Sequence, residues 1–361
     1  MNGSGTDTFS AFKRAQVHHR RQGNNPNRSD DLAEVIDFSR GGDDRIVKLE
    51  IPKDLDQNVS NEDIYRGPIY GLEGFPGFLF APNALADSIQ TELAYQSVSE
   101  YCEAPHRTNI DLCPPKQNEE CNYSERMWEL WKKSSIVQEK KSKKQKLGAQ
   151  YGKKYRCFKK LSWATTGLHY NWTERSYNKE EKSEMPLFLG NLSKIFARTS
   201  LMLEGNPKNS SRYQFSPEAS IVNFYNTKSL MGGHRDDLEE AVDKPVVSLS
   251  TGLSAIFLLG GKTKDDEPVL PILIRPGDVM CLGGDSRLNY HSMARVLPHC
   301  IQIPERDSLL CPRTDQQVSV SKVSFLPTTI EPKDRVALEE YLCNHRININ
   351  IRMVWNPETT F

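Results

Sequence analysis

Polar and apolar residues alternate with a period of two over residues 346–352, which read Arg-Ile-Asn-Ile-Asn-Ile-Arg. Because neighbouring side chains of a β-strand point to opposite faces, this pattern predicts a strand with all four polar side chains on one face. An Arg on the inward face of a sheet is costly to bury unless an anion meets it. The strand is therefore predicted to line a cavity that holds an acidic ligand.

Short apolar segments separated by Gly and Pro follow one another from Tyr213 onward, which is typical of an all-β barrel or jelly roll. A short helix at 336–342 is expected to lead into the final strand. The other expected strands are 221–225, two segments within 246–259 that hinge at Thr251 and Gly252, 272–274 and 279–282.

The earlier part of the chain shows helical spacing instead. Asn83 is placed as the N-cap of a helix that continues past Leu93. A second helix is expected around 127–131, and a third begins near Pro186. By contrast, residues 24–45 are polar and punctuated by Gly, which favours a linker or disorder.

The composition is that of a soluble globular protein, since 37% of the 361 residues are apolar and 26% are charged. The eight cysteines form no Cys-x-x-Cys pair, so reduced thiols inside a cell are expected. The longest apolar run, 255–259, is too short to cross a bilayer, and no membrane contact is expected. Basic residues up to Arg21 favour a mitochondrial presequence or a disordered basic tail. Nucleus, cytoplasm and mitochondrion all suit such a protein, which we expect to be a monomer.

Charge is balanced overall but unevenly distributed. The chain has 47 Lys and Arg and 47 Asp and Glu, yet residues 132–160 hold twelve Lys or Arg and one acid, Glu139. Three aromatic residues interleave with Lys153, Lys154 and Arg156, a mixture that lets cations meet phosphates while rings meet bases. A solvated helix face or loop would show the same lysines.

Aromatic residues are concentrated in 161–172, directly after the basic stretch, and this segment is expected to form the wall of a hairpin. Trp163, Tyr170 and Trp172 are interpreted either as ordinary core residues or as a base-stacking floor beside an active cavity.

A metal site is predicted from His234, Asp236 and His291. His234 and Asp236 are two residues apart and point to the same side if the chain is extended, whereas Asp237 would face away. Two His and one carboxylate form the facial arrangement of non-haem Fe(II) oxygenases, although a zinc hydrolase can use the same three donors. Arg346 separates the two interpretations, because an oxygenase needs an anion-binding group for a dicarboxylate cosubstrate.

Four groups of residues, taken in chain order, resemble the AlkB family of Fe(II)/2-oxoglutarate-dependent dioxygenases. They are Asn223 and Tyr225; His234 and Asp236; His291; and Arg346, Asn348, Asn350 and Arg352. Residues 168–172, 255–261, 286–288 and 294–298 further resemble the AlkB homologue 1 branch, and a looser similarity extends back to Phe12 and 35–39.

The resemblance implies a double-stranded β-helix, or jelly roll, mainly β with an α extension, preceded by a helical N-terminal region and a nucleotide-recognition lid. The implied regions are 1–69, a partly disordered extension; 70–160, helical with the basic stretch; 161–212, lid and supporting helix; and 213–356, the catalytic core.

The resemblance also implies roles for individual residues. His234, Asp236 and His291 would bind Fe(II), and Arg346 would pair with the distal carboxylate of 2-oxoglutarate. The cosubstrate set is Asn223, Tyr225, Arg346, Asn348, Asn350 and Arg352. The substrate set is Trp163, His169, Tyr170, Asn171, Trp172, Lys153, Lys154 and Arg156.

The implied reaction uses O2 and 2-oxoglutarate to hydroxylate an N-methyl group on a nucleobase, which is then lost as formaldehyde. The leading substrates are 1-methyladenine in tRNA and then N6-methyladenine in DNA, in single-stranded or bulged form. Repair-type members carry a second acid where this chain has Leu238, which weakens transfer of the DNA-repair substrates. A protein or histone hydroxylase with the same iron site and a non-catalytic nucleic-acid binding module are the alternatives.

Overall fold

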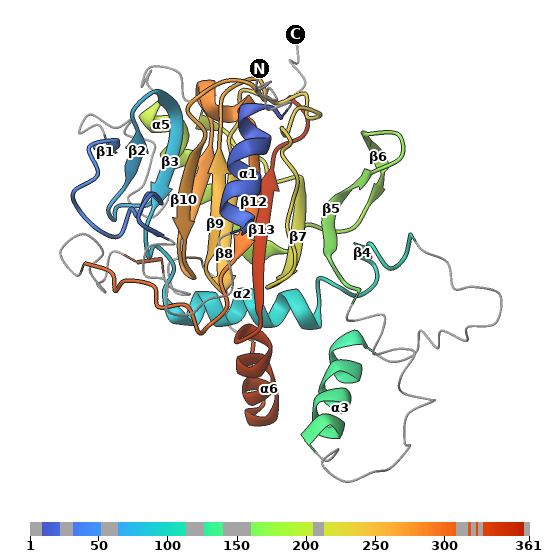
Figure 1. Cartoon of the computed structure of the whole chain (residues 1–361). Coiled ribbons are helices and arrows are strands. Elements are labelled where there is room, and N and C mark those ends of the chain that lie inside the picture. The colour runs from blue at the N-terminus through green and yellow to red at the C-terminus, as the bar shows by residue number, and fades with distance from the viewer. Residues whose placement is uncertain are drawn as a thin grey trace, which may run out of the picture.

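Two antiparallel β-sheets and a layer of helices make up the computed structural model (Figure 1). It describes residues 9–21, 32–51, 64–112, 126–139, 160–204, 213–307, 317–318, 323 and 328–356. The ten-stranded sheet contains, in spatial order, β1 (Ile46–Lys48), β2 (Tyr70–Leu72), β3 (Phe75–Ala81), β11 (Val279–Leu282), β8 (Val246–Gly252), β13 (His345–Arg352), β7 (Ala219–Asn226), β5 (Trp163–Asn171) and β4 (Arg107–Thr108), with β6 (Ser176–Lys182) paired to β5. The three-stranded sheet has the order β10 (Leu270–Ile274), β9 (Ala255–Leu259), β12 (His291–Val296). This architecture is consistent with the predicted jelly roll.

The alternating strand predicted from the sequence is β13, which lies between β7 and β8 near the middle of the large sheet. Ile347, Ile349 and Ile351 are at most 1% exposed and pack in the apolar cluster between this sheet and the helices. The polar residues of β13 occupy the opposite face, toward the small sheet. The predicted alternation is confirmed, and β8 and β9 meet at the expected bend, where Gly252 has a φ of +79°.

Helices cover the outer face of the large sheet. α2 (Asp87–Ser99) contacts β8, α5 (Leu187–Leu203) contacts β3, β8, β11 and β13, and α3 (Met127–Glu139) and α6 (Pro332–Leu342) pack against α2. Pro186 is the N-cap of α5, so the predicted start of a helix near Pro186 is confirmed. The prediction that Asn83 caps α2 is wrong. Asn83 has a φ of 52° in a turn, its backbone N–H donates to Asp278 Oδ1 at 2.8 Å, and the helix begins after Ala86.

The prediction of a linker or disorder at 24–45 is wrong for the part that the structure describes. Phe38 is 1% exposed and its ring stacks on Phe80 of β3, with centroids 4.3 Å apart. Asp37 accepts two hydrogen bonds from the guanidinium of Arg275, at 2.5 and 2.6 Å. The polar composition gave no sign of these two contacts, one aromatic and one ionic. They fix residues 32–45 against β3 and Arg275.

We expect Phe38→Leu to lower the free energy of unfolding by about 1–2 kcal/mol, because it removes ring volume and one stacked aromatic pair from the core. Denaturant unfolding measures the change. Phe9→Leu is the matched control, since Phe9 is 51% exposed and should change stability by less than about 0.5 kcal/mol. Equal effects at the two positions would contradict the packing of residues 32–45.

The N-terminal segment forms α1 (Ala11–Arg21), which lies against β12 and β9 on the outer face of the small sheet (Figure 1). Phe12 is 3% exposed and packs with Ile256 and Leu258. The expectation of a disordered basic tail is therefore wrong over these eleven residues. None of the described helices combines the length and the apolar character that a membrane crossing requires.

The regions predicted from the sequence share one sheet. β1 comes from the predicted N-terminal extension, β2 and β3 from the helical region, and β5 from the predicted lid, and all four lie in the ten-stranded sheet with the strands of the predicted core. The hairpin of β5 and β6 is therefore anchored at its base, through the pairing of β5 with β7.

Candidate metal centre and its pocket

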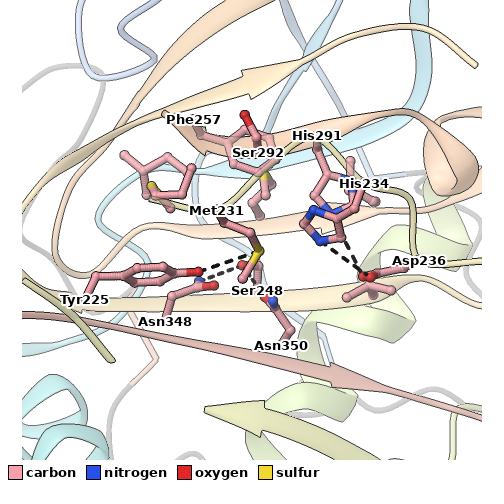
Figure 2. A pocket seen from close by; sticks show the side chains of 15 residues that line it. Tyr225, Met231, His234, Asp236, Ser248, Phe257, His291, Ser292, Asn348 and Asn350 are labelled. Carbon is pink, nitrogen blue, oxygen red and sulfur yellow. Dashed lines mark hydrogen bonds and ion pairs between the residues drawn. The ribbon is translucent and has the colours of Figure 1, made fainter. Parts of the chain in front are cut away.

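Two histidines from distant parts of the chain are brought together by backbone pairing. His234 and His291 form an antiparallel bridge in which each N–H donates to the other's carbonyl, at 3.1 and 2.9 Å. Paired residues on neighbouring strands carry their side chains on the same face. Their rings lie 4.4 Å apart between centroids, and both face the space between the two sheets (Figure 2).

Asp236 completes the group. Its Oδ1 lies 3.9 Å from His234 Nε2 and its Oδ2 lies 4.0 Å from His291 Nε2. One donor atom from each residue lies within 4.8 Å of the others, which fits a shared metal ion. The neighbouring Asp237 instead pairs with Arg235 at 3.1 Å, as expected for a side chain that faces away.

The hydrogen bonds of the two histidines leave Nε2 of each ring available to bind a metal. His234 Nδ1 lies 3.0 Å from the carbonyl of Gly232, and His291 Nδ1 lies 3.0 Å from the carbonyl of Asn289. A carbonyl only accepts, so Nδ1 carries the proton and Nε2 keeps its lone pair. Burial, followed by the neighbouring His234, lowers the pKa of His291 to about 4, so this ring is neutral at pH 7 and ready to coordinate.

A buried ion network holds Asp236 in place. Arg352 Nη2 lies 3.3 Å from Asp236 Oδ2, and Arg352 Nη1 donates to Glu239 Oε1 at 2.9 Å. Glu239 Oε2 also accepts from Arg287 Nη2 at 3.0 Å, and Arg287 Nη1 donates to the backbone carbonyl of Asp236. Burial opposes ionisation of Asp236, but the groups around it, Arg352 first among them, together outweigh burial and hold the pKa of this carboxyl below its ordinary value.

Sequence reasoning missed Glu239 and gave Arg287 no role, although the side chains of both are only 1% exposed. Glu239 follows Asp236 by three residues in a polar run and resembles a surface acid. The signal that could have found it is the number of arginines near the site, since Arg352 and Arg287 require buried counterions.

We expect Glu239→Gln to weaken Fe(II) binding by about 10- to 100-fold, because the support of the metal carboxylate is lost while all three donors remain. Titration of Fe(II) under anaerobic conditions measures the affinity, and excess metal should restore part of the turnover. Glu240→Gln is the matched control, since Glu240 is exposed. An unchanged metal affinity in Glu239→Gln would show that the network has no effect on the metal centre.

Arg346 lies at the opposite end of β13 from Arg352, and its surroundings differ from those of Arg352. Arg346 is 0% exposed, and its guanidinium donates to the carbonyl of Leu253 at 3.1 Å and to Ser250 Oγ at 2.8 Å. Its Nε is buried with no hydrogen-bond partner, and no carboxylate among the described residues pairs with this side chain. Burial lowers the pKa of Arg346 to about 10, which leaves it charged at pH 7. A buried cation without a counterion fits an incoming carboxylate.

The metal donors line a pocket enclosed by the two sheets, and Arg346 lies two residues before the lining Asn348 on the same face of β13. Met231 projects into it, and its Sδ accepts a hydrogen bond from Tyr225 at 3.8 Å (Figure 2). Ser248 connects the two asparagines of β13, since its Oγ accepts from Asn348 Nδ2 and donates to Asn350 Oδ1, each at 2.8 Å. The apolar lining consists of Val246, Phe257, Ile274, Met280, Leu282 and Met293.

Asn223 lies beside this pocket through the register of the sheet. It is directly paired with Asn348 on one side and with Trp163 on the other, so the three side chains share the inward face. The predicted cosubstrate residues are thereby brought to one face of two adjacent strands, β7 and β13.

The aromatic residues of the β5–β6 hairpin form a cluster. The ring centroids of Trp163 and Trp172 lie 5.2 Å apart, and Tyr170 meets Trp172 edge-on at 4.7 Å. Trp172 is 44% exposed, which is unusual for so large an apolar side chain. The cluster offers rings on which a further ring can stack.

Two predicted substrate residues take structural positions in the same hairpin. His169 is 3% exposed, its Nδ1 lies 2.9 Å from Thr165 Oγ1, and burial lowers its pKa to about 4. Asn171 Oδ1 accepts from the backbone N–H groups of Thr173 and Glu174, at 3.0 and 3.1 Å, and so shapes the turn. None of the predicted substrate residues in this hairpin lines the pocket, whether His169 and Asn171 or Trp163, Tyr170 and Trp172. Lys153, Lys154 and Arg156 lie outside the described residues.

The sequence of the chain is similar to those of known iron-dependent oxygenases. Residues 116–352 match the 2OG-Fe(II) oxygenase superfamily. The human protein named nucleic acid dioxygenase ALKBH1 is 30% identical over 363 residues, covering 92% of this chain and 81% of the human protein.

Two further relatives are similar over different lengths. The Arabidopsis thaliana protein named DNA N(6)-methyladenine demethylase ALKBH1A is 27% identical and covers 96% of both chains. The Schizosaccharomyces pombe protein named tRNA demethylase abh1 is 33% identical over 143 residues, covering 39% of this chain and 44% of that protein.

Proposed function

The chain belongs to the AlkB family of 2OG-Fe(II) oxygenases, and we propose that it demethylates N-methylated bases in nucleic acid. The preferred substrate in this proposal is 1-methyladenine in tRNA, and the second is N6-methyladenine in DNA. The observation that carries the proposal is one pocket lined by all three metal donors, with the buried Arg346 beside it on the inward face of β13 and in no ion pair with a described carboxylate.

The residues present fit the family's cofactors, Fe(II) and 2-oxoglutarate. His234, Asp236 and His291 would hold the metal, because two neutral imidazoles and one carboxylate leave coordination positions open. Arg346 would receive the distal carboxylate of 2-oxoglutarate, since its guanidinium is buried and forms no ion pair with a carboxylate of the described residues. Tyr225, Asn223, Asn348 and Asn350 supply hydrogen-bonding groups between these two ends.

When bound with O2, these cofactors supply an oxidation that converts 2-oxoglutarate to succinate and CO2 and hydroxylates the N-methyl group, which then leaves as formaldehyde. The protein's own part is preorganisation. Arg352 and Arg287 keep Asp236 ionised and fixed, and the carbonyls of Gly232 and Asn289 fix the histidine tautomers. Phe257 stacks on His291 at 5.8 Å and keeps water from that side of the ring.

The exposed aromatic cluster supports a base as the substrate. Bringing a base out of its stack costs a few kcal/mol, and stacking on aromatic side chains contributes about 1–3 kcal/mol per base in return. Trp163 and Trp172, with Tyr170 beside them, are proposed as this stacking surface. Single-stranded, bulged or tRNA-loop substrates are favoured because they are easier to open than a duplex.

The names of the relatives support nucleic acid as the partner but differ in polymer. The Schizosaccharomyces pombe relative is named for tRNA and the Arabidopsis relative for DNA. Lys153, Lys154 and Arg156 stay predicted phosphate contacts. A monomer in the nucleus, cytoplasm or mitochondrion is likewise part of the proposal.

The test combines Fe(II), 2-oxoglutarate and O2 with a 1-methyladenosine tRNA stem-loop or an N6-methyladenine single-stranded DNA. We expect succinate and formaldehyde in equal amounts and loss of the methyl group by mass spectrometry, fastest for the tRNA stem-loop. Unmodified versions of both polymers are the controls. Succinate without any change of base would contradict the proposal and would favour the protein hydroxylase class.

A further inference from the structure

A second hollow lies outside the metal pocket and shares no lining residue with it. It has a volume of about 760 Å³ and runs between β6, α5 and the residues that follow β13. We call it the basic groove and define it by the cations and the floor that line it. The cations are Lys179, Lys182, Lys194 and Arg198, and the floor contains Leu168, Phe215, Met353 and Trp355.

The basic groove is positively charged, although the protein as a whole is neutral. Among the described residues that line it are four cations and a single carboxylate, Glu218, whereas the whole chain has 47 residues of each sign. Glu218 Oε2 accepts from the backbone N–H groups of Val354 and Trp355, at 2.7 and 2.8 Å. This carboxylate is thus engaged with the main chain, and the groove carries an excess of positive charge.

The cations stand on two opposite elements. Lys179 and Lys182 belong to β6 and are exposed, while Lys194 and Arg198 are four residues apart on α5 and share one face of that helix. Positive charge on both walls suits a polyanion that runs along the groove better than a single small acid. Trp355 adds an aromatic ring, with Lys179 Nζ 5.1 Å from the ring centroid.

The β5–β6 hairpin links the basic groove to the proposed base-stacking surface. Leu168 and Tyr177 pack in one small apolar cluster against which Tyr170 and Trp355 also pack. Tyr170 belongs to the aromatic cluster and Trp355 to the groove, so one compact set of side chains separates the two. A chain whose base stacks on the hairpin is therefore within reach of the groove with its neighbouring nucleotides.

We propose that the basic groove binds the phosphate backbone of nucleotides that flank the methylated base. This inference rests on the proposed function, since it concerns the same polynucleotide. Phosphate contacts position a strand without reading its sequence, so the groove would contribute affinity for long substrates and leave the choice of base to the metal pocket.

The test reverses two groove charges in Lys182→Glu/Lys194→Glu. Binding of a 20-nucleotide single-stranded RNA is followed by fluorescence anisotropy at several salt concentrations, without iron or 2-oxoglutarate. We expect affinity to fall by at least about tenfold and the slope of log K against log salt to fall by about 1.4, which is 0.7 for each lost phosphate contact. The KM for a tRNA stem-loop should rise, whereas turnover of a trinucleotide centred on the methylated base should stay unchanged.

The matched control is Lys48→Glu/Lys333→Glu, which changes the net charge equally at exposed positions on β1 and α6. An equal loss in the control, or no loss in the groove variant, would overturn the proposal. Because binding is measured without turnover, a wild-type protein that binds RNA but demethylates nothing would contradict the proposed function alone. A wild-type protein that binds phosphatidylserine vesicles or an acidic peptide through these lysines, and no RNA, would overturn the groove assignment.

Discussion

Asp236→Ala is expected to reduce 2-oxoglutarate turnover by at least about 10³-fold, equivalent to about 4 kcal/mol of transition-state stabilisation. The substitution removes the only carboxylate of the metal group and leaves two neutral imidazoles, which bind Fe(II) weakly. Succinate release measures turnover, and retention of metal during gel filtration measures binding. RNA affinity should remain nearly unchanged, because no proposed phosphate or stacking contact is altered.

Asp237→Ala provides the matched control for this change. Asp237 is next to Asp236 in the chain and is also a carboxylate, so it was the alternative candidate for the metal ligand. In the structure it pairs with Arg235 instead. We expect this variant to bind iron and to form succinate at nearly the wild-type rate. Activity that survived in Asp236→Ala and disappeared in Asp237→Ala would exchange the two assignments.

Local periodicity accounts for what the sequence predicted well. The alternation in residues 346–352 predicted β13 and its polar face, because a side-chain period of two depends only on the extended backbone. The same principle separated Asp236 from Asp237. The pairing of His234 with His291 joins residues 57 positions apart, and the sequence predicted the three donors but not this backbone pairing.

Long-range packing accounts for what it missed. Glu239 is recognised as part of the metal centre only when Arg287 and Arg352 are seen on either side of it, and these partners are 48 and 113 residues away. The anchoring of Phe38 on Phe80 is likewise invisible in a polar, Gly-punctuated segment. The contact of His169 with Thr165 is likewise not encoded in the aromatic run from which a substrate role was predicted for His169.

Arg346→Met is expected to remove most of the stabilisation by 2-oxoglutarate while leaving the cofactor-free protein as stable as, or more stable than, the wild type. Replacing a buried charge that has no counterion by an apolar side chain of similar length removes a desolvation cost. Losing the partner of the cosubstrate carboxylate should cost about 2–5 kcal/mol of binding free energy, which is roughly 30- to 5,000-fold in affinity.

The same substitution at Arg352 provides the comparison, because Arg352 is expected to support the fold whereas Arg346 is expected to bind the cosubstrate carboxylate. Arg352→Met leaves Asp236 and Glu239 buried without this cation, so the cofactor-free protein should lose about 3–5 kcal/mol of stability. Thermal unfolding of the anaerobic, metal-loaded proteins is measured with and without 2-oxoglutarate at 100 times the wild-type dissociation constant. The wild type should gain about 2.7 kcal/mol and Arg346→Met less than about 1 kcal/mol. A destabilised Arg346→Met protein that still gained the full 2.7 kcal/mol with ligand would show that Arg346 supports the fold and that the cosubstrate carboxylate binds elsewhere.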